Sequence, residues 1–527
     1  MSEPARPTRL RKRPEWWARD RPDQAAVVDG DQVLSYAEWN HRANQLADAL
    51  IAADPDGRSV AVLLHQRFEW FIINLAMAKL GWDHIAIPWN ETLSRRVDMV
   101  RASGARLVFA DGADVAKLAE ATGEIGARTF NCGAPVPEVP GFASLLGDAE
   151  PTPRHSQRNA ALVKYTSGTT GRPRGVRRPE IRSQEEARRR RESARPPQEL
   201  SGVHENWLYE HHRALITLPL HHGVGPRGAR VCHSEGGTCY LLDRYDPVAA
   251  LEIIDRAGIT HWTTVPTMLQ RIRNLPSETL AAHDVTSMRM LAVGSAPSSM
   301  ALKQWVLSYF GYTLFEGYGA SEVGLVSLMS PFDHEQRPGS CGRLRPHVSV
   351  RVVDANDVEV PTGEVGELCI RTPLTIAGYI DDGPGGSASV TADGYFRIGD
   401  YGRMDEDGFL YITGRAKDMV VRGGVNIFPA EIEDALLQHP DVAAAAVIGV
   451  PDEEFGEQLM AFCELRPGGP ATEEQLREHA AERLARHKTP KTVTVVAALP
   501  RNEMGKVVKA RLREEYWRGS DFVTSPD

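Results

Sequence analysis

Lysine is scarce in this chain of 527 amino acids: only ten of its 61 basic residues are lysines, and the other 51 are arginines. Arginine and lysine are not interchangeable at sites that need a compact, mobile charge, so each lysine that remains invites a chemical explanation. The sequence also lacks an excess of positive charge. Its net charge of −9 and the absence of one basic stripe argue against a nucleic-acid-binding protein.

Long apolar runs are missing as well. No run of about 18 or more apolar residues occurs, so we expect no membrane span. A basic stretch, Arg9–Arg13, is followed by Pro14–Trp17 instead of the apolar segment of a signal peptide, which favours the cytoplasm. Paired cysteine spacings are absent too, which predicts reduced thiols rather than disulfides or a metal site at Cys132, Cys232, Cys239, Cys341, Cys369 and Cys463.

The apolar pattern predicts an α/β fold. Helices are expected over 40–52 and 69–80, and strands over 59–64, 84–88 and 106–110. This alternation is typical of doubly wound, mostly parallel sheets covered by helices on both faces. Two more buried strands are predicted over 259–266 and 288–293, and a small β-rich unit is expected around 349–370.

A glycine-rich stretch, Tyr165–Gly175, follows a short strand predicted over 160–163. Its three glycines allow tight turns and a close approach to a ligand, and its hydroxyls and arginines are donors suited to a polyphosphate. Gly175 is followed by Val176 and Arg177, so the stretch does not match the nucleotide loop that ends in Gly-Lys-Ser/Thr. We predict a phosphate-binding loop of another kind.

Further motifs follow in order. Phe315–Glu322 contains an aromatic ring between two glycines, then a hydroxyl and a carboxylate. Gly394–Asp400 and Gly414–Asp418 supply a carboxylate and a guanidinium that suit ribose and phosphate. A double glycine precedes the helix that begins at Pro429, and Lys506 stands in a Gly-Lys pair near the C-terminus.

These motifs, in this order from about Gln32 to Arg511, resemble the acyl-adenylating superfamily of acyl-CoA synthetases, luciferases and peptide-synthetase adenylation domains. The resemblance implies a large domain over 1–415, with its β-rich subdomain at about 335–415. A small mobile α+β domain would cover 416–527, and Lys417 would act as the hinge.

The resemblance also implies roles for single residues. Lys506 would be the mobile catalytic lysine, Ser321 would touch phosphate, and Glu322 would hold Mg²⁺. ATP and coenzyme A would be bound by Thr166, Ser167, Gly168, Thr169, Thr170, Gly171, Arg174, Ser295, Ala296, Pro297, Tyr318, Gly319, Asp400, Arg415, Gly423 and Gly424. The acid would lie near His222, Trp262 and Gly294.

The activity implied by the resemblance is an ATP-dependent ligase that joins a hydrophobic carboxylic acid to CoA through an acyl-adenylate. Fatty, aryl and polycyclic or terpenoid acids stay open. Amino acids are disfavoured, because the aspartate that adenylation domains place in the pocket has no counterpart between Ile259 and Leu269. The alternatives are transfer to a carrier protein or to another nucleophile, and a non-enzymatic nucleotide-binding relative. A homodimer is the base-rate expectation.

Two features depart from a simple match. Family loops end in Pro-Lys-Gly, whereas this loop ends in Pro173-Arg174-Gly175. The arginine-rich stretch over 182–200 is interpreted as a solvated helix that ends in a loop, because charge runs usually mark exposed faces.

Overall fold

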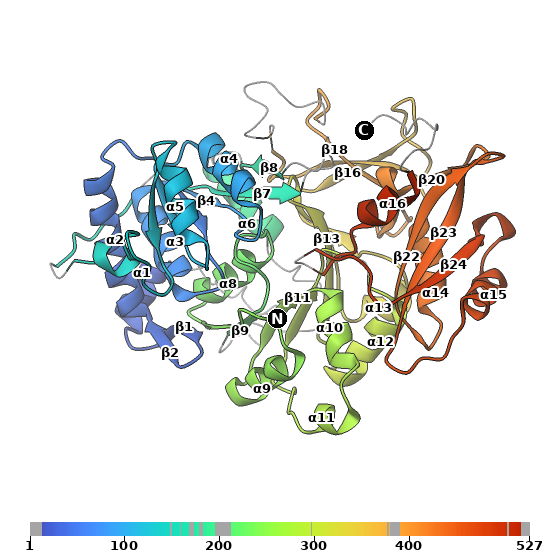
Figure 1. The fold of residues 1–527 in the computed structure, drawn as a ribbon, viewed down its shortest axis with the longest axis horizontal. Helices are drawn as coiled ribbons and strands as arrows, with labels where there is room; N and C mark the ends of the chain where they lie inside the picture. Colours follow the sequence, from blue (N-terminus) through green and yellow to red (C-terminus); the bar gives the residue numbers. More distant parts are fainter. Residues whose placement is uncertain are drawn as a thin grey trace, which may run out of the picture.

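The structure is a computed structural model. It describes residues 13–147, 150–156, 158, 160–167, 173–178, 183–194, 212–296, 298–376, 379, 390–502 and 505–517. Two large sheets, a four-stranded sheet and a five-stranded sheet form the fold (Figure 1). None of the helices in the described part of the chain combines the length and the apolar character that a membrane span needs.

The first large sheet has six strands in the order β6-β5-β3-β4-β7-β8, and all neighbours are parallel except the hairpin β7–β8. Its outer face is covered by the helices α4 (Leu93–Ser103) and α5 (Val115–Gly123). The strands are β3 (Ser59–Leu63), β4 (Asp83–Ala86), β5 (Leu107–Ala110), β6 (Arg128–Asn131), β7 (Leu162–Ser167) and β8 (Pro173–Val176).

The second large sheet has nine strands in the order β15-β14-β13-β12-β11-β9-β10-β1-β2. The six strands from β13 to β1 run parallel, and the pairs at both edges are antiparallel. The strands are β1 (Ala25–Asp29), β2 (Gln32–Ser35), β9 (Arg213–Ile216), β10 (Thr238–Leu241), β11 (His261–Thr264), β12 (Met290–Val293), β13 (Leu314–Ala320), β14 (Gly324–Met329) and β15 (Arg343–Leu344).

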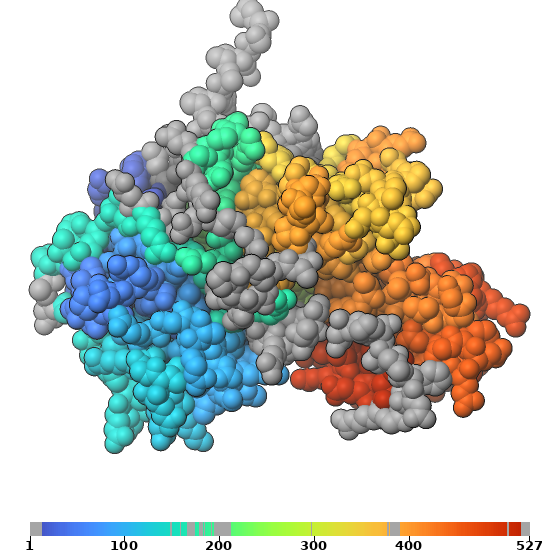
Figure 2. Space-filling model, turned by 90° about the horizontal axis from the view of Figure 1, so that it is seen from above, coloured from blue at the N-terminus to red at the C-terminus, as the bar shows by residue number. Residues whose placement is uncertain are grey.

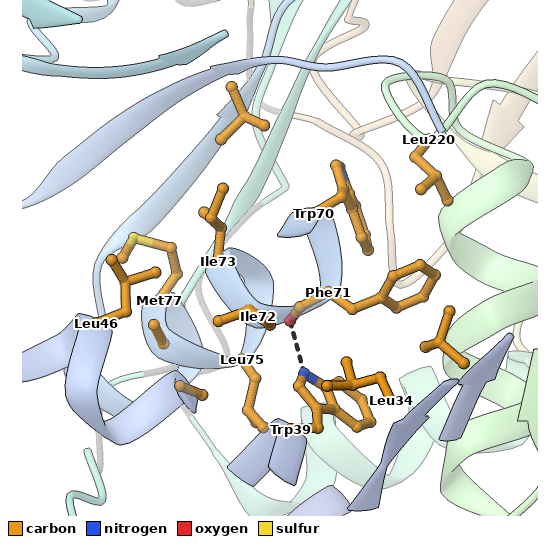
Figure 3. Close-up of a cluster of buried hydrophobic side chains, with 14 of the residues drawn as sticks. Leu34, Trp39, Leu46, Trp70, Phe71, Ile72, Ile73, Leu75, Met77 and Leu220 are labelled. Atoms are coloured by element: carbon orange, nitrogen blue, oxygen red, sulfur yellow. Dashed lines mark hydrogen bonds between the residues drawn. The ribbon is translucent and has the colours of Figure 1, made fainter. Parts of the chain in front are cut away.

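A layer of helices fills the space between the two large sheets. Helices α2 (Tyr36–Ala53), α3 (Phe68–Leu80) and α8 (Gly225–Ser234) share one apolar core with strands of both sheets. Helix α3 is apolar on nearly every side, as expected for a helix enclosed between two sheets. Figure 3 shows this core, in which Trp39 Nε1 donates a hydrogen bond of 2.9 Å to the Phe71 carbonyl.

The outer face of the nine-stranded sheet is covered by α9 (Pro247–Ala257), α10 (Pro266–Arg273) and α12 (Met300–Tyr309). The other helices that the structure describes in the large domain are α1 (Pro14–Asp20), α6 (Gln184–Ala194), α11 (Ser277–Ala281) and α13 (Asp333–Gln336), with a 3₁₀ turn at Phe142–Leu145. Together the layers alternate helix, sheet, helix, sheet and helix, so the predicted doubly wound α/β architecture is confirmed.

Two smaller sheets follow. The antiparallel sheet of β16 (Ser349–Val353), β17 (Gly366–Arg371), β18 (Phe396–Met404) and β19 (Leu410–Arg415) is the predicted β-rich unit. The C-terminal sheet contains β20 (Val420–Arg422), β21 (Val425–Ile427), β22 (Val442–Asp452), β23 (Gly456–Leu465) and β24 (Thr492–Val496). It is accompanied by α14 (Pro429–Leu437), α15 (Glu473–Arg483) and α16 (Lys509–Trp517).

The C-terminal domain lies across the molecule from the N-terminal residues, as Figure 2 shows with orange to red atoms on one side and blue atoms on the other. It touches the large domain at defined points. Arg466 Nη1 donates a hydrogen bond of 2.9 Å to Asn274 Oδ1. A Cβ added to Gly505 would lie 2.2 Å from Thr267 Oγ1, so the loop that carries Lys506 lies directly on the start of α10.

Most predicted elements lie within a few residues of their observed places, and one differs in a way that matters. The strand predicted over 160–163 runs over Leu162–Ser167, so the first residues of the glycine-rich stretch are sheet rather than loop. The solvated helix predicted from 182 is α6, which ends at Ala194 in the described part. The six cysteines are free thiols, and five of them are buried.

Candidate active site

The glycine-rich stretch joins β7 to β8 as an antiparallel hairpin, in which Tyr165 pairs with Gly175 and Thr166 with Arg174. Tyr165 OH donates a hydrogen bond of 3.2 Å to the Met99 carbonyl, and Val176 packs in the core of the four-stranded sheet. The hairpin is therefore anchored on both sides. Gly168, Thr169, Thr170 and Gly171 lie outside the described residues, as do the side chains of Thr166 and Ser167.

Arg174, the residue that departs from the family pattern, lies on an aromatic ring. Its guanidinium carbon is 3.8 Å from the ring centroid of Tyr379, and Tyr379 OH donates a hydrogen bond of 3.0 Å to Glu322 Oε1. A planar guanidinium stacks on an aromatic face, and a lysine ammonium does so less well. Arginine at this position therefore supports the tyrosine that orients the Glu322 carboxylate.

Strand β13 carries Tyr318, and the turn that follows carries Ser321 and Glu322. A Cβ added to Gly319 would lie 2.0 Å from the Gly324 carbonyl oxygen, so only glycine allows β13 and β14 to approach this closely. Tyr318 OH donates a hydrogen bond of 2.7 Å to Asp400 Oδ2. Burial, followed by the Asp400 charge, raises the pKa of Tyr318, so this hydroxyl stays a donor.

Asp400 and Arg415 are directly paired residues of β18 and β19, and Arg415 Nε is 3.1 Å from Asp400 Oδ1. Asp400 is only 4% exposed. Its Oδ1 accepts no hydrogen bond of acceptable geometry from the described residues. A buried carboxylate oxygen left in this state costs free energy, so a ligand that brings hydroxyl donors fits this position.

Lys506 approaches the same cluster from the C-terminal domain. Burial first, and then Arg415 and Lys417, lower the pKa of Lys506 to about 8, while Asp418 and Asp400 oppose this shift. Its backbone nitrogen donates to Asn502 Oδ1 at 2.9 Å, and Gly505 before it has a φ of +70° that favours glycine. The structure therefore brings Lys506 together with Asp400 and Arg415 from the large domain.

Lys417 lies in the short 3₁₀ turn Ala416–Asp418 between the four-stranded sheet and the C-terminal sheet. Burial first, and then the Arg415 charge, lower the pKa of Lys417. Gly423 and Gly424 form the exposed turn from β20 to β21 with φ values of +56° and +80°. A Cβ added to Gly423 would lie 3.1 Å from Phe455 Cδ1, and one added to Gly424 would meet no atom within 4 Å.

The residues predicted to contact the acid lie in different environments. Gly294 and Ser295 form a tight turn after β12, with a φ of +69° at Ser295, and a Cβ on Gly294 would lie 3.2 Å from the Gly317 carbonyl oxygen. Ala296 follows in the same turn, and Pro297 lies outside the described residues. The strain at Ser295 is a feature common at ligand sites.

His222 is half-buried in the segment after β9, with its ring centroid 4.6 Å from that of the buried His221. Trp262 behaves differently, because it is 1% exposed in the core under α9 and α10. Its Nε1 donates a hydrogen bond of 3.0 Å to Thr217 Oγ1. The structure thus packs the Trp262 side chain in the core of the nine-stranded sheet.

One residue of this region was not predicted. Lys164, in the middle of β7, directs its Nζ to the Gly223 carbonyl oxygen at 3.4 Å, close to Ser321. It is one of only ten lysines in the chain, so the scarcity that drew attention to Lys506 also pointed to this residue.

The side chains of this site suit a metal ion that is held mainly by a bound nucleotide and only in part by the protein. No group of three or more His, Cys, Asp or Glu side chains that could hold a metal ion occurs among the described residues. Glu322 would supply one carboxylate, and Mg²⁺ commonly takes only one or two carboxylates from the protein, completing its shell with phosphate and water oxygens. The residues present therefore fit Mg²⁺ that arrives with a nucleotide.

A model of the AMP-binding enzyme family matches residues 14–380, and a model of the AMP-binding enzyme C-terminal domain matches residues 431–506. The chain belongs to the AMP-binding enzyme family. An indoleacetate–CoA ligase from Aromatoleum aromaticum is 32% identical over 94% of this AMP-binding enzyme and 95% of its own length. A fatty acid–[acyl-carrier-protein] ligase from Streptomyces coeruleorubidus is 31% identical over 95% of each chain.

Solved structures agree with this AMP-binding enzyme along its length. The amide bond synthetase McbA from Marinactinospora thermotolerans matches with a TM-score of 0.82 and 28% identity, over 95% of this chain and 99% of its own. ATP-bound MatB from Rhodopseudomonas palustris, at 28% identity, matches with a TM-score of 0.80 over 96% and 99% of the two chains. The apo form of MatB gives 0.70, so the overall shape is nearer the ATP-bound form.

The predicted resemblance to acyl-adenylating enzymes and the fold class are confirmed by these matches. The named relatives also agree with the predicted classification as an AMP-forming acid–thiol ligase. The AMP-binding enzyme family accounts for ATP as a substrate, whereas the identity of the acid and of the acceptor depends on this chain's own residues.

Proposed function

We propose that this protein is an ATP-dependent carboxylic acid–CoA ligase with two half-reactions. In the first, a carboxylate oxygen bonds to the α-phosphorus of ATP, the bond to the pyrophosphate oxygen breaks, and an acyl-adenylate forms. In the second, the CoA sulfur bonds to the acyl carbon and AMP leaves. The observation that carries the proposal is that Lys506, from one domain, lies within the charge cluster of Asp400 and Arg415 from the other.

For the first half-reaction, the residues would divide the work by chemistry. The buried Asp400 carboxylate, with one oxygen held by Tyr318 and the other beside Arg415, is suited to ribose hydroxyls. Lys506 would place a compact positive charge between the two anionic reactants and neutralise the charge that develops. Mg²⁺ on Glu322, when bound, would reduce the repulsion between the phosphates and the incoming carboxylate.

For the second half-reaction, we propose a rotation of the small domain about Lys417, with the boundary between residues 415 and 416. Such hinge motions let one cleft serve two reactions in sequence. Rotation would withdraw Lys506 and bring another part of the small domain to the cleft. The exposed turn at Gly423 and Gly424 is proposed as the side of the channel that admits the thiol, since its glycines leave room for a narrow ligand arm.

Two comparisons favour a second candidate, in which the adenylate forms in the same way and the acceptor differs. One relative of 31% identity is named as a ligase for acyl-carrier protein, and a structural match with a TM-score of 0.82 is named as an amide bond synthetase. A carrier-protein thiol or an amine would then replace CoA. The reacting acid and Lys506 would keep the same roles.

The test is pyrophosphate release by the full chain with ATP and Mg²⁺ against a panel of carboxylic acids, with and without CoA, and with mass detection of products. Acid-dependent release with an acyl-CoA product supports the ligase. Acyl-adenylate that accumulates in the presence of CoA moves the acceptor to a carrier protein or an amine. Release that no acid stimulates contradicts the adenylating function altogether and favours a non-enzymatic nucleotide-binding protein.

A further inference from the structure

The turn that carries Glu322 is held from two directions. The Glu322 carbonyl oxygen accepts a hydrogen bond of 3.0 Å from the backbone N–H of Ile376 and another of 3.2 Å from Arg178 Nη1. On the side chain, Oε1 accepts the hydrogen bond from Tyr379 OH that was described above. Both the backbone and the carboxylate of Glu322 are therefore fixed by residues from outside the strands β13 and β14.

Residues 372–376, which follow β17, form a short clasp over this turn. Thr372 Oγ1 donates a hydrogen bond of 2.6 Å to the Val323 carbonyl and accepts one of 2.8 Å from the backbone N–H of Leu374. Val323 and Ile376 are buried in one apolar cluster. The clasp and the Glu322 turn thus form one packed unit.

Arg178 joins this unit to the glycine-rich hairpin. It stands two residues after β8, the second strand of the hairpin, which lies beside the four-stranded sheet (Figure 1). Its Nη1 donates both to the Glu322 carbonyl and to the Leu374 carbonyl of the clasp. A Cβ added to Gly324 would lie 3.7 Å from its Nη2. One guanidinium therefore connects three segments: the hairpin, the Glu322 turn and the clasp.

An arginine suits this position for two reasons. Its guanidinium carries several N–H donors in a fixed plane, so it can serve carbonyl groups from two segments at once. Hydrogen bonds from a charged donor are also stronger than those between neutral groups. Burial lowers the pKa of Arg178 to about 10, while the Glu322 charge opposes the shift, so the guanidinium stays charged near neutral pH.

Mg²⁺ makes strict demands on its ligands. It requires a nearly octahedral shell at short distances, so a site with one protein carboxylate depends on how that carboxylate faces the phosphates. Residues that hold a metal ligand in place commonly change the metal affinity by about 10- to 100-fold. A residue that fixes the Glu322 turn relative to the hairpin acts on this geometry.

Resting on the proposed adenylating function, we infer that Arg178 is a positioning residue for Mg²⁺: it fixes the Glu322 turn to the hairpin, so that the carboxylate and the nucleotide phosphates meet the ion together. Its role is indirect, because Arg178 holds the Glu322 carbonyl while the carboxylate is the ligand. Two other roles can be distinguished from this one, namely direct contact with phosphate and support of the fold alone.

The experiment measures how Mg²⁺ and nucleotide binding depend on each other, without turnover. Calorimetry gives the Kd of the full chain for α,β-methylene-ATP, which cannot be cleaved at the reacting bond, in Mg²⁺ and in EDTA. We expect the tightening by Mg²⁺ to be about tenfold smaller in Arg178→Met than in wild type, because the displaced carboxylate binds the ion less well. The Kd in EDTA should stay within about threefold of the wild-type value.

Arg190→Met is the matched control. Arg190 Nε donates a hydrogen bond of 3.0 Å to the Pro373 carbonyl, so it holds the same clasp at a different carbonyl. Its tightening by Mg²⁺ should lie within about twofold of wild type. Arg178→Lys keeps the charge and can reach one carbonyl, so it should restore part of the loss. Melting curves show whether each variant is folded.

Each outcome decides the inference. Unchanged tightening in a folded Arg178→Met variant overturns it. A weaker Kd in EDTA, with the same tightening by Mg²⁺, also overturns it and assigns Arg178 to phosphate. An equal loss of tightening in Arg190→Met overturns it as well and assigns both arginines to support of the clasp. If Arg178→Met does not fold, the same two Kd values for Arg178→Lys decide.

Pyrophosphate release gives a second readout. The Mg²⁺ concentration for half-maximal release should rise by about tenfold in Arg178→Met, while kcat at saturating Mg²⁺ stays within about threefold of wild type. If no acid releases pyrophosphate from the wild type, the proposed function fails, and the calorimetry still decides the inference. If Mg²⁺ does not tighten nucleotide binding to the wild type, the inference fails whatever the release assay shows.

Discussion

The residues proposed for the nucleotide and those proposed for the acid are held in different ways. On the nucleotide side, charges meet partners within the protein: Asp400 has Tyr318 and Arg415, and Glu322 has Tyr379. Among the residues proposed for the acid, the Gly294–Ser295 turn is strained, with a φ of +69° at Ser295, and the His222 ring packs on the His221 ring. Charges that are already oriented suit a ligand that never changes, such as the nucleotide, whereas a turn and packed rings suit a ligand recognised mainly by its shape.

The largest expected effect tests the nucleotide side. Lys506→Ala should lower acid-dependent pyrophosphate release by about a thousandfold or more, roughly 4 kcal/mol, because its compact charge would neutralise the charge that develops at the reacting phosphorus. The loss should be the same for every acid. Thioester formation from a supplied acyl-adenylate should persist.

The control for this change is Lys509→Ala, three residues further on, since Lys509 Nζ pairs with Glu433 Oε1 at 2.6 Å. Its rate should stay within about threefold of wild type, as expected for a structural ion pair. Retention of more than about a tenth of the activity by Lys506→Ala would remove Lys506 from the first half-reaction.

A smaller effect is expected at Asp400. Asp400→Ala should raise KM for ATP by about thirty- to a hundredfold, because the ribose hydroxyls would lose their acceptor and Arg415 its ion pair. The KM for the acid should change little, which would sharpen the division between the two sides. Steady-state kinetics with each substrate varied in turn measure both constants. An equal rise in both KM values would show instead that Asp400 supports the whole cleft.

The pH dependence should follow Lys506. Its pKa is lowered to about 8, so the ammonium is charged below that pH and becomes neutral above it. The kcat/KM for ATP should therefore fall as pH rises through about 8, by about tenfold per unit. Lys506→Arg, although slower, should keep its charge and lose this basic limb. A wild-type profile that stays flat to about pH 10 contradicts the assignment.

The smallest effect is expected for Arg174→Lys. Lysine keeps the charge and loses the stacked guanidinium over Tyr379, so adenylation should fall by less than about tenfold. Tyr379→Phe, which removes the hydrogen bond to Glu322, should produce a similar loss at limiting Mg²⁺. A fall beyond about a hundredfold, roughly 2.7 kcal/mol, in Arg174→Lys would mean that the fork of the guanidinium binds phosphate directly.

Features that depend on neighbouring residues could be predicted from the sequence, whereas contacts between distant segments that no motif marks could not. The strand and helix periods, and motifs such as the one around Tyr318, are local, so the α/β fold and the meeting of Tyr318, Asp400 and Arg415 could be anticipated. The scarcity of lysine marked Lys164, but its position could not be predicted, because only the folded chain brings the middle of β7 beside Gly223. Trp262 was predicted near the acid, yet side chains alternate along β11, and Trp262 points into the core while Thr263 points toward α8.

The place of β1 in the nine-stranded sheet has a consequence for how the chain is made. Val27 of β1 pairs with Cys239 of β10, although more than two hundred residues separate them in the sequence. At about 5–20 residues per second, synthesis delivers β10 about 10–40 seconds after β1. During that time the apolar edge of β1, and the face of α2 and α3 that packs on the second sheet, have no partner. The helices α2 and α3, which cover the six-stranded sheet, therefore cannot bury their other face until nearly half of the chain has been synthesised.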